Sequence, residues 1–326
     1  MPELRRALAT HLRQARSVNC DPDQIVITEG VHQAVDLIAR LLGDPHDKVW
    51  VEEPGYWGIR SVLTINGMQV EAVPVDAEGL APEARHHEHP PKLIFVTPSH
   101  QYPLGSVMSL RRRLALLEYA SKHSSWIVED DYDSEFRFSG HPIPSLQGLV
   151  PDAPVIYIGT FSKTLYPGMR IAYMVLPKGL APAFCTGRSE LYREGHLMTQ
   201  ATLAEFIDAG HYSAHIRRMR LIYSSRRAAL IALVQKWLGP GWLHPNDSNA
   251  GLHLVLSLPN WMNDVQVARA ALERGVVVRP LSRYYAGGSA ESGLLLGFAC
   301  LTERQMLEPF AVLADCLRAQ NTMRQR

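Results

Sequence analysis

Short apolar runs alternate with helical patterns along the first part of the chain. Such runs are typical of buried strands, and apolar residues at helical spacing predict helices that pack on one face. Since helical segments separate many of these runs, the pattern predicts an α/β fold. The predicted strands are residues 25–28, 48–52, 69–75, 93–96, 126–128, 155–158 and 171–176.

The pattern changes after Pro177, where a long helical segment, 212–237, leads into a smaller predicted α+β domain. Its predicted strands are 252–258, 275–279 and 294–298, and its predicted helices are 265–274 and 304–318. We therefore divide the chain into three parts. We expect residues 1–18 to form an N-terminal helix that packs on the small domain and residues 19–205 to form a large domain. Residues 206–326 would form the long connecting helix and the small C-terminal domain.

One predicted helix begins after Ser109, a favourable N-cap, and ends at His123. Its helical spacing predicts a buried stripe made of Leu110, Leu114, Leu117 and Ala120. The three arginines at 111–113 are expected to lie in solvent.

A polar turn between the strands 155–158 and 171–176 carries candidate chemistry. A lysine amine at such a position, Lys163, is costly to bury unless it is consumed in a covalent bond. The hydroxyls of Thr160 and Ser162 and the guanidinium of Arg170 would supply donors for a phosphate monoester. Together these groups suggest pyridoxal phosphate (PLP). A Ser-Lys dipeptide in solvent is the alternative.

Two further strand ends carry polar groups. Residues 129–133 place carboxylates after a strand, and a carboxylate beside a pyridine nitrogen keeps that ring protonated. An acidic turn in water is the alternative. The strand 25–28 runs through Gly30 into a helix, and a helix start of this kind binds anions. Strand ends near residues 28, 130 and 160 would meet in one crevice of an open α/β sheet.

Several motifs carry a resemblance to a known family. They are Gly159-Thr160-Phe161-Ser162-Lys163 with Pro167-Gly168-Met169-Arg170, and the segments 129–136, 98–105, 53–56, 200–220 and 251–254. The chain resembles the aminotransferase-like domain of MocR/GabR-type transcription regulators of the GntR family. The resemblance implies a fold-type I PLP-dependent transferase, whose large domain has a mostly parallel sheet of the seven-stranded type.

The resemblance also implies the site residues. Lys163 would be the catalytic residue and would bind PLP covalently, Asp130 would face the pyridine nitrogen, and Tyr132 would face the ring hydroxyl. Tyr56 would stack on the ring. The residues around the phosphate would be Val31, His32, Thr160, Ser162 and Arg170.

The resemblance further implies partners. The family forms sites at a dimer interface, so we expect a homodimer with the loops near Tyr56 and Tyr102 in the interface. A small-molecule or amino-acid-like effector is implied as the ligand. Regulators of this type carry a winged helix-turn-helix ahead of this domain, and no matching pattern occurs in this chain. With a formal charge of +1, we expect no direct binding of nucleic acid by this chain.

Two positions depart from the pattern of aminotransferases. Leu295 stands where such enzymes place an arginine that grips the substrate carboxylate, and Gly58 stands where sensing regulators often place a second one. Arg279 and Arg283 are candidates for a different anion, or arginines in solvent. Three functions remain: an effector-sensing domain whose DNA-binding part is absent from this chain, a free-standing aminotransferase, and a PLP-holding dimerisation scaffold. We expect weak or no transaminase turnover.

Composition and residue spacing bear on the cellular location and on metal binding. The four cysteines have neither the spacing of a disulfide framework nor that of metal ligands, and no signal peptide precedes them. We therefore expect a cytoplasmic protein. No apolar run reaches the length of a membrane span. His86, His87 and His89 lie in a polar loop without carboxylate or cysteine partners at ligand spacing, so we expect no metal site.

Overall fold

The computed structural model describes residues 1–140, 143–193, 195–287 and 290–324, and it contains two sheets. The large sheet has eight strands in the order β1-β8-β7-β6-β5-β2-β3-β4. These strands are β1 (Ile25–Thr28), β2 (Lys48–Glu53), β3 (Gln69–Asp76), β4 (Gly79–Leu80), β5 (Leu93–Val96), β6 (Trp126–Asp131), β7 (Val155–Thr160) and β8 (Ala172–Val175).

The large sheet is mostly parallel, as predicted. The pairs β2/β3, β2/β5, β5/β6 and β6/β7 are parallel. Strand β8 runs antiparallel to both β7 and β1, and the two-residue β4 is antiparallel to β3. The carboxyl ends of the parallel strands therefore lie along one edge, which is where open α/β sheets bind ligands.

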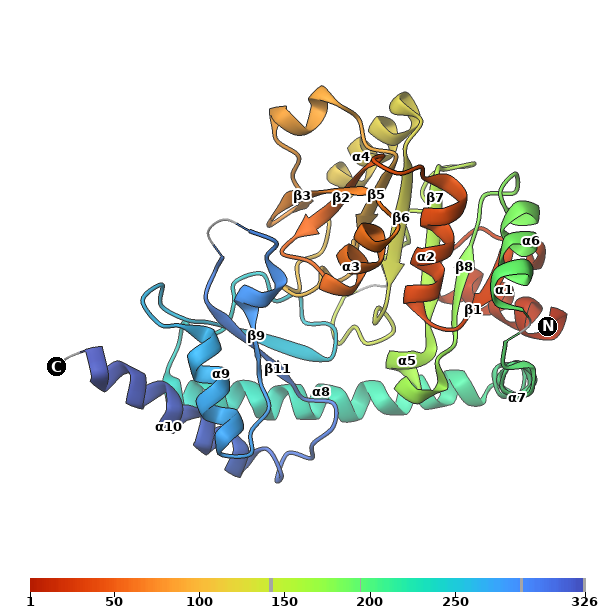
Figure 1. Ribbon diagram of the computed structural model, residues 1–326. Helices are drawn as coiled ribbons and strands as arrows, with labels where there is room; N and C mark the ends of the chain where they lie inside the picture. Colours follow the sequence, from red (N-terminus) through yellow and green to blue (C-terminus); the bar gives the residue numbers. More distant parts are fainter. Residues whose placement is uncertain (141–142, 194, 288–289, 325–326) are drawn as a thin grey trace.

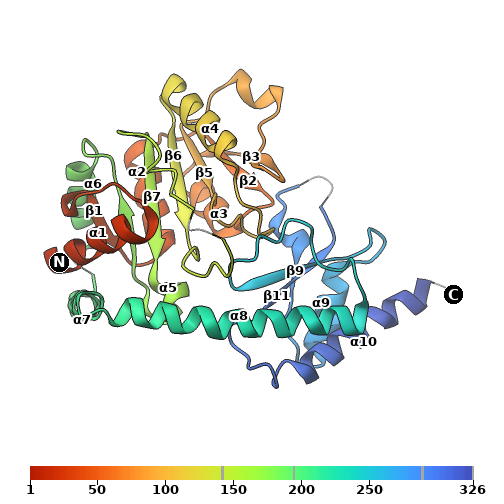
Figure 2. The same ribbon diagram turned by 180° about the vertical axis from the view of Figure 1, so that it is seen from behind.

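Helices cover both faces of the large sheet. Figure 1 shows α2 (Val31–Leu42) and α3 (Trp57–Ile65) in front of it, and Figure 2, from behind, shows α1 (Pro2–Arg16) and α4 (Leu110–His123). The helix α6 (Ala181–Tyr192) shares a core with α2, because Phe184 and Leu37 are buried in the same cluster. The sheet is thus buried on both faces, which explains its continuous apolar strands.

The N-terminal helix packs on the large sheet, whereas the sequence led us to expect it on the small domain. Leu4, Leu8 and Leu12 of α1 are buried in one cluster with Ile25 of β1 and with α7 (Leu197–Asp208). The apolar spacing of α1 was interpreted correctly as a packing face. Spacing alone does not identify the surface that covers such a face.

Helix α4 buries Leu117 and Ala120, as predicted, but not Leu110 and Leu114. Its N-cap is Ser109, which accepts a hydrogen bond from the Arg112 N–H at 3.2 Å. Leu110 and Leu114 are 60% and 45% exposed, whereas Arg113 is 2% exposed. The Arg113 guanidinium donates to three backbone carbonyls, those of Met108 (3.0 Å), Pro144 (2.9 Å) and Pro98 (2.7 Å). The expectation that all three arginines lie in solvent is therefore wrong for Arg113.

The long helix α8 (His211–Leu238) runs along one side of both sheets (Figure 1) and leads to the small one. That sheet is antiparallel, in the order β10-β11-β9, and packs against α9 (Asp264–Glu273) and α10 (Leu307–Arg324). Its strands are β9 (His253–Ser257), β10 (Arg279–Pro280) and β11 (Gly293–Gly297). The predicted strand 275–279 is wrong except at its end, because Val277 is 77% exposed and only Arg279 pairs.

The remaining elements are short. Helix α5 (Phe161–Thr164) follows β7 directly, and the 3-10 helices are η1 (Pro22–Gln24), η2 (Ala84–Glu88), η3 (Pro167–Met169) and η4 (Leu281–Tyr284). In η2, His86 is buried and its ring contacts the Ala72 carbonyl at 3.2 Å and the Glu83 N–H at 2.9 Å. Of the helices that the structure describes, none is both long enough and apolar enough to cross a membrane.

Candidate cofactor-binding site

A cavity of about 380 Å³ lies where the predicted strand ends meet. The large sheet provides most of its lining, and Arg279 of the small sheet completes it. All nine predicted site residues line this cavity: Val31, His32, Tyr56, Asp130, Tyr132, Thr160, Ser162, Lys163 and Arg170. The structure thus brings together residues that are up to 139 positions apart in the chain, from Val31 to Arg170.

Lys163 lies on the four-residue helix α5, directly after β7, and its side chain is exposed toward the cavity. This exposure removes the desolvation cost that the sequence suggested for the lysine. Thr160, the N-cap of α5, accepts a hydrogen bond from the Ser162 N–H at 3.1 Å. The two hydroxyl residues and the amine are therefore held by one tight strand-to-helix turn.

Another part of the lining combines a helix start with a guanidinium. Helix α2 has Gly30 as its N-cap, at φ 97°, and no side chain caps it. The Arg170 guanidinium donates to the Glu29 carbonyl at 3.3 Å, and a Cβ at Gly30 would lie 3.4 Å from the Arg170 Cζ. Free N–H groups in a first turn beside a guanidinium favour an anion such as a phosphate.

Tyr56 is fixed by His32. The Tyr56 hydroxyl lies 3.0 Å from His32 Nε2, and the two rings are stacked with centroids 5.7 Å apart. A Cβ at Gly58 would lie 2.5 Å from His32 Nε2 and 2.6 Å from the Tyr56 ring. A side chain at position 58 would therefore require these two rings to move.

Asp130 is the carboxylate of β6 that faces the cavity. It is 7% exposed, and its Oδ1 is buried without a hydrogen-bond partner in the described part of the chain. Burial, together with the charges of Asp131 and Asp133, raises the pKa of Asp130 to about 7, whereas Lys163 opposes the rise. An unpaired buried carboxylate is costly, so this site fits a ligand that presents a cationic N–H.

Tyr132 contacts a buried polar pair beneath the cavity. Its hydroxyl lies 2.9 Å from His100 Nδ1, and the same nitrogen lies 3.1 Å from both carboxylate oxygens of Asp133. His100 and Asp133 are 3% and 1% exposed. The phenol is therefore positioned by residues of two different loops.

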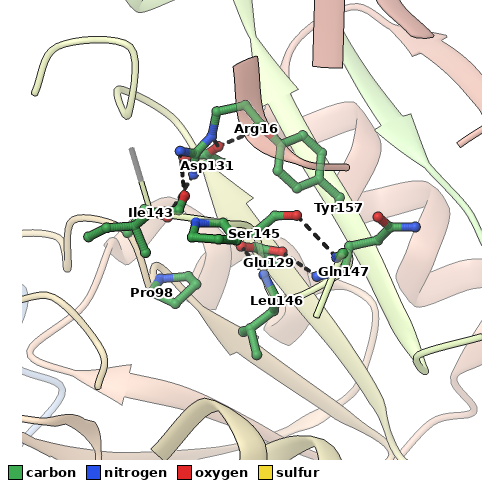
Figure 3. Close-up of polar contacts among 12 residues, drawn as sticks. Arg16, Pro98, Glu129, Asp131, Ile143, Ser145, Leu146, Gln147 and Tyr157 are labelled. Atoms are coloured by element: carbon green, nitrogen blue, oxygen red, sulfur yellow. Dashed lines mark hydrogen bonds and ion pairs between the residues drawn. The ribbon is translucent and has the colours of Figure 1, made fainter. Parts of the chain in front are cut away.

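Asp131, next to Asp130, points to the other side of β6 and has a structural partner (Figure 3). Its Oδ2 accepts hydrogen bonds from Arg16 Nε at 2.7 Å and from the Tyr157 hydroxyl at 2.6 Å. Arg16 also donates to Ser99 Oγ at 2.8 Å. Successive strand residues face opposite sides, so one carboxylate of this pair serves the cavity and the other ties α1 to the sheet.

Six lining residues were not among the nine predicted site residues: Gly30, Trp57, Thr97, Tyr102, Pro167 and Arg279. Thr97 follows β5 and donates its hydroxyl to the buried Glu52 at 2.5 Å. The rule that located residues 28, 130 and 160 would also have found Thr97, because it is polar and follows an apolar strand. Arg279 comes from the small sheet. The sequence offered it, with Arg283, as a candidate for a different anion, but did not show that β10 meets this crevice.

These residues fit PLP as a bound group. The α2 start, Thr160, Ser162 and Arg170 would hold its phosphate, and the unpaired Asp130 would hold its pyridine nitrogen. Lys163 would hold it covalently through its amine. When bound, PLP supplies an electron sink for reactions at an amino-bearing carbon.

Comparison with known sequences identifies the family of the chain. The chain matches the family described as aminotransferase class I and II over residues 1–311. It is 41% identical over 307 residues to the probable rhizopine catabolism regulatory protein MocR of Rhizobium meliloti, covering 94% of this chain and 62% of that protein. It is 35% identical over 318 residues to the HTH-type pyridoxine biosynthesis transcriptional regulator PdxR of Corynebacterium glutamicum, covering 96% and 67%. The chain thus spans about two thirds of the length of these relatives.

Solved structures agree on the fold. The kynurenine aminotransferase of Pyrococcus horikoshii superposes with a TM-score of 0.88 at 28% identity, covering 98% of this chain and 81% of that chain. An archaeal alanine:glyoxylate aminotransferase gives a TM-score of 0.90 at 28% identity, with the same coverage. The fold is the fold-type I aminotransferase fold, with a mostly parallel large sheet and a small antiparallel sheet. The chain belongs to the aminotransferase class I and II family and is homologous to the aminotransferase-like domain of MocR-type transcription regulators.

Proposed function

We propose that this chain is the PLP-binding, effector-sensing domain of a MocR-type transcription regulator. The observation that carries the proposal is the cavity in which Lys163, the unpaired Asp130 and the anion-binding wall at Arg170 face one another. Its similarity to regulators named MocR and PdxR supports a regulatory rather than a metabolic role.

Each residue has a defined task in this proposal. Lys163 binds PLP covalently, and Asp130, once paired with the pyridine N–H, keeps that proton on the ring. Tyr132, oriented by His100, donates toward the ring hydroxyl. Tyr56 stacks on the ring and is itself held by His32 at 3.0 Å.

We expect weak transaminase turnover because of one residue of the small sheet, Leu295. Leu295 is 6% exposed and lies in an apolar cluster with Leu104 and Leu281. A leucine cannot form the bidentate pair through which an arginine would fix a carboxylate. Precise orientation of the reacting amino acid depends on such a pair, so the chain favours binding of an effector over repeated transamination.

We also propose the setting of this domain. It forms a cytoplasmic homodimer whose interface includes the loops near Tyr56 and Tyr102, and it does not itself bind DNA. Trp57 supports the interface, since this large apolar residue beside Tyr56 is 49% exposed.

PLP titration followed by visible absorbance tests the proposal. The wild type should bind one PLP per chain with a new visible band, Lys163→Ala should lose the band, and Lys178→Ala should keep it, because Lys178 is an exposed lysine outside the cavity. The PLP-loaded protein is then screened against amino acids for a rise in Tm. A protein that stays colourless, or a PLP-loaded protein that turns over amino acids rapidly, contradicts the proposal.

A further inference from the structure

Arg279 places a second guanidinium on the wall of the cavity, contributed by the small sheet. Arg170 provides the first, on the wall formed by the start of α2. The charges of Arg279 and Arg170 both oppose the rise in the pKa of Tyr56 that burial causes, so both cations lie close to this phenol. The cavity lining therefore carries two guanidinium groups, and a single phosphate held at Arg170 would leave Arg279 available.

The register of the small sheet places Arg279 opposite Leu295. The two residues are direct partners in the antiparallel pair β10/β11. Side chains of directly opposed residues project from the same face of a sheet, with Cβ atoms about 5 Å apart. Leu295 packs in one cluster with Tyr284 and Tyr102, so that face looks toward the cavity. A long arginine on β10 thus reaches the region that a side chain at position 295 would face.

Phenols lie near the Arg279 side chain. Hydrogen bonding with Tyr284, and more weakly with Tyr102, favours the charged form and raises the pKa of Arg279 against the opposing effect of burial. The hydroxyls of these two tyrosines lie 3.0 Å apart. The Tyr284 carbonyl accepts a hydrogen bond from the Gly55 N–H at 3.1 Å, which ties this group to the loop before Tyr56. Phenols orient a guanidinium without neutralising its charge, so the cation stays available for an anion.

We propose that Arg279 binds the carboxylate of the ligand that enters this cavity. The inference rests on the proposed function and specifies its ligand class as a carboxylate that reaches past the cofactor to β10. A guanidinium fork pairs with a carboxylate through two parallel hydrogen bonds. Arg279 would thereby hold a carboxylate from β10, a different strand from the one on which aminotransferases place their arginine.

Arg283 provides a matched control. It is an exposed arginine four positions away, on η4, and it does not line the cavity. Both arginines were candidates on sequence grounds, and only Arg279 has the required position. Replacing either by glutamine removes one positive charge from the same surface, so long-range electrostatic effects should be similar for the two variants.

The test measures propionate binding to the PLP-loaded protein by saturation-transfer NMR. Propionate carries a carboxylate but no amine, so it cannot react with PLP, and propionamide is its uncharged counterpart. The wild type should bind propionate and not propionamide. We expect Arg279→Gln to weaken propionate binding on the order of 10- to 100-fold, the loss of a charge-assisted pair. Arg279→Lys should lose less, and Arg283→Gln should bind as the wild type does.

Visible absorbance is recorded for each variant, because retained PLP shows that the fold and the phosphate wall are intact. With PLP retained, equal affinity of Arg279→Gln and wild type would overturn the inference, as would a loss shared equally by Arg283→Gln. A PLP-loaded wild type that binds no propionate would overturn it too. A wild type that holds no PLP would overturn the proposed function as well, so the two failures are distinguishable.

Discussion

Two neighbouring carboxylates should respond to the same substitution with opposite changes in stability. Asp130 faces the cavity without a partner for its Oδ1, whereas Asp131 accepts hydrogen bonds from Arg16 and Tyr157. Replacing each by asparagine keeps the shape and removes the charge. In the cofactor-free protein, we expect Asp130→Asn to raise the free energy of unfolding at pH 8 and Asp131→Asn to lower it.

The magnitudes follow from the surroundings. The pKa of Asp130 rises from 3.8 to about 7, chiefly through burial. Because the folded-state value is the higher one, ionisation destabilises the folded protein progressively as pH rises from about 4 to about 7. The difference of about three pH units corresponds to about 4 kcal/mol. Asp131→Asn leaves the buried Arg16 without its counter-charge, which costs about 3–5 kcal/mol.

Urea denaturation of cofactor-free protein at pH 8 and at pH 4 measures both effects. The gain from Asp130→Asn should be present at pH 8 and nearly absent at pH 4, where Asp130 is protonated in the folded state and about half ionised in the unfolded state. PLP affinity should fall in this variant, because the pyridine N–H loses its anionic partner. Equal destabilisation by the two substitutions, or a gain that does not depend on pH, would refute the assignment of Asp130 as an unpaired cofactor ligand.

Three further predictions follow. Arg113→Met should lower the free energy of unfolding by about 2–4 kcal/mol, since three backbone carbonyls lose their hydrogen bonds from a buried guanidinium, while Arg111→Met should change it by less than about 0.5 kcal/mol in the same urea assay. Light scattering should show a dimer, and a charge at exposed Trp57, introduced as Trp57→Glu, should shift it toward monomer. Mixed with amino acids and a keto-acid acceptor, the wild type should yield little product because Leu295 offers no fork, and multiple rapid turnovers would contradict this.

The strand ends were the part of the site that the sequence could predict. Residues 28–32, 130–132 and 160–163 follow apolar runs, and parallel strands bring such ends to one edge regardless of the distance between them in the chain. The nine residues therefore converge, although their roles toward PLP stay predictions. The sequence argument for Lys163 rested on the cost of burying its amine. In the structure, the side chain is exposed toward the cavity.

Other features depend on contacts that periodicity does not encode. The buried stripe of α4 includes Arg113 because surrounding backbone carbonyls accept hydrogen bonds from its guanidinium group. The sequence pattern alone treats arginine as a polar, exposed residue. The position of Arg279 depends on a two-residue strand and its register with β11, which no local pattern predicts. The predicted packing of α1 on the small domain was wrong for the same reason, since an apolar stripe can pack on either domain.

The central claim is that Lys163 binds PLP covalently in this cavity. The most direct measurement is reduction of the PLP-loaded protein with sodium borohydride, followed by peptide mass spectrometry. We predict a single modified peptide that contains Lys163, and no modification of that site in Lys163→Ala. Modification spread over exposed lysines such as Lys178, or no modified peptide at all, would contradict the account.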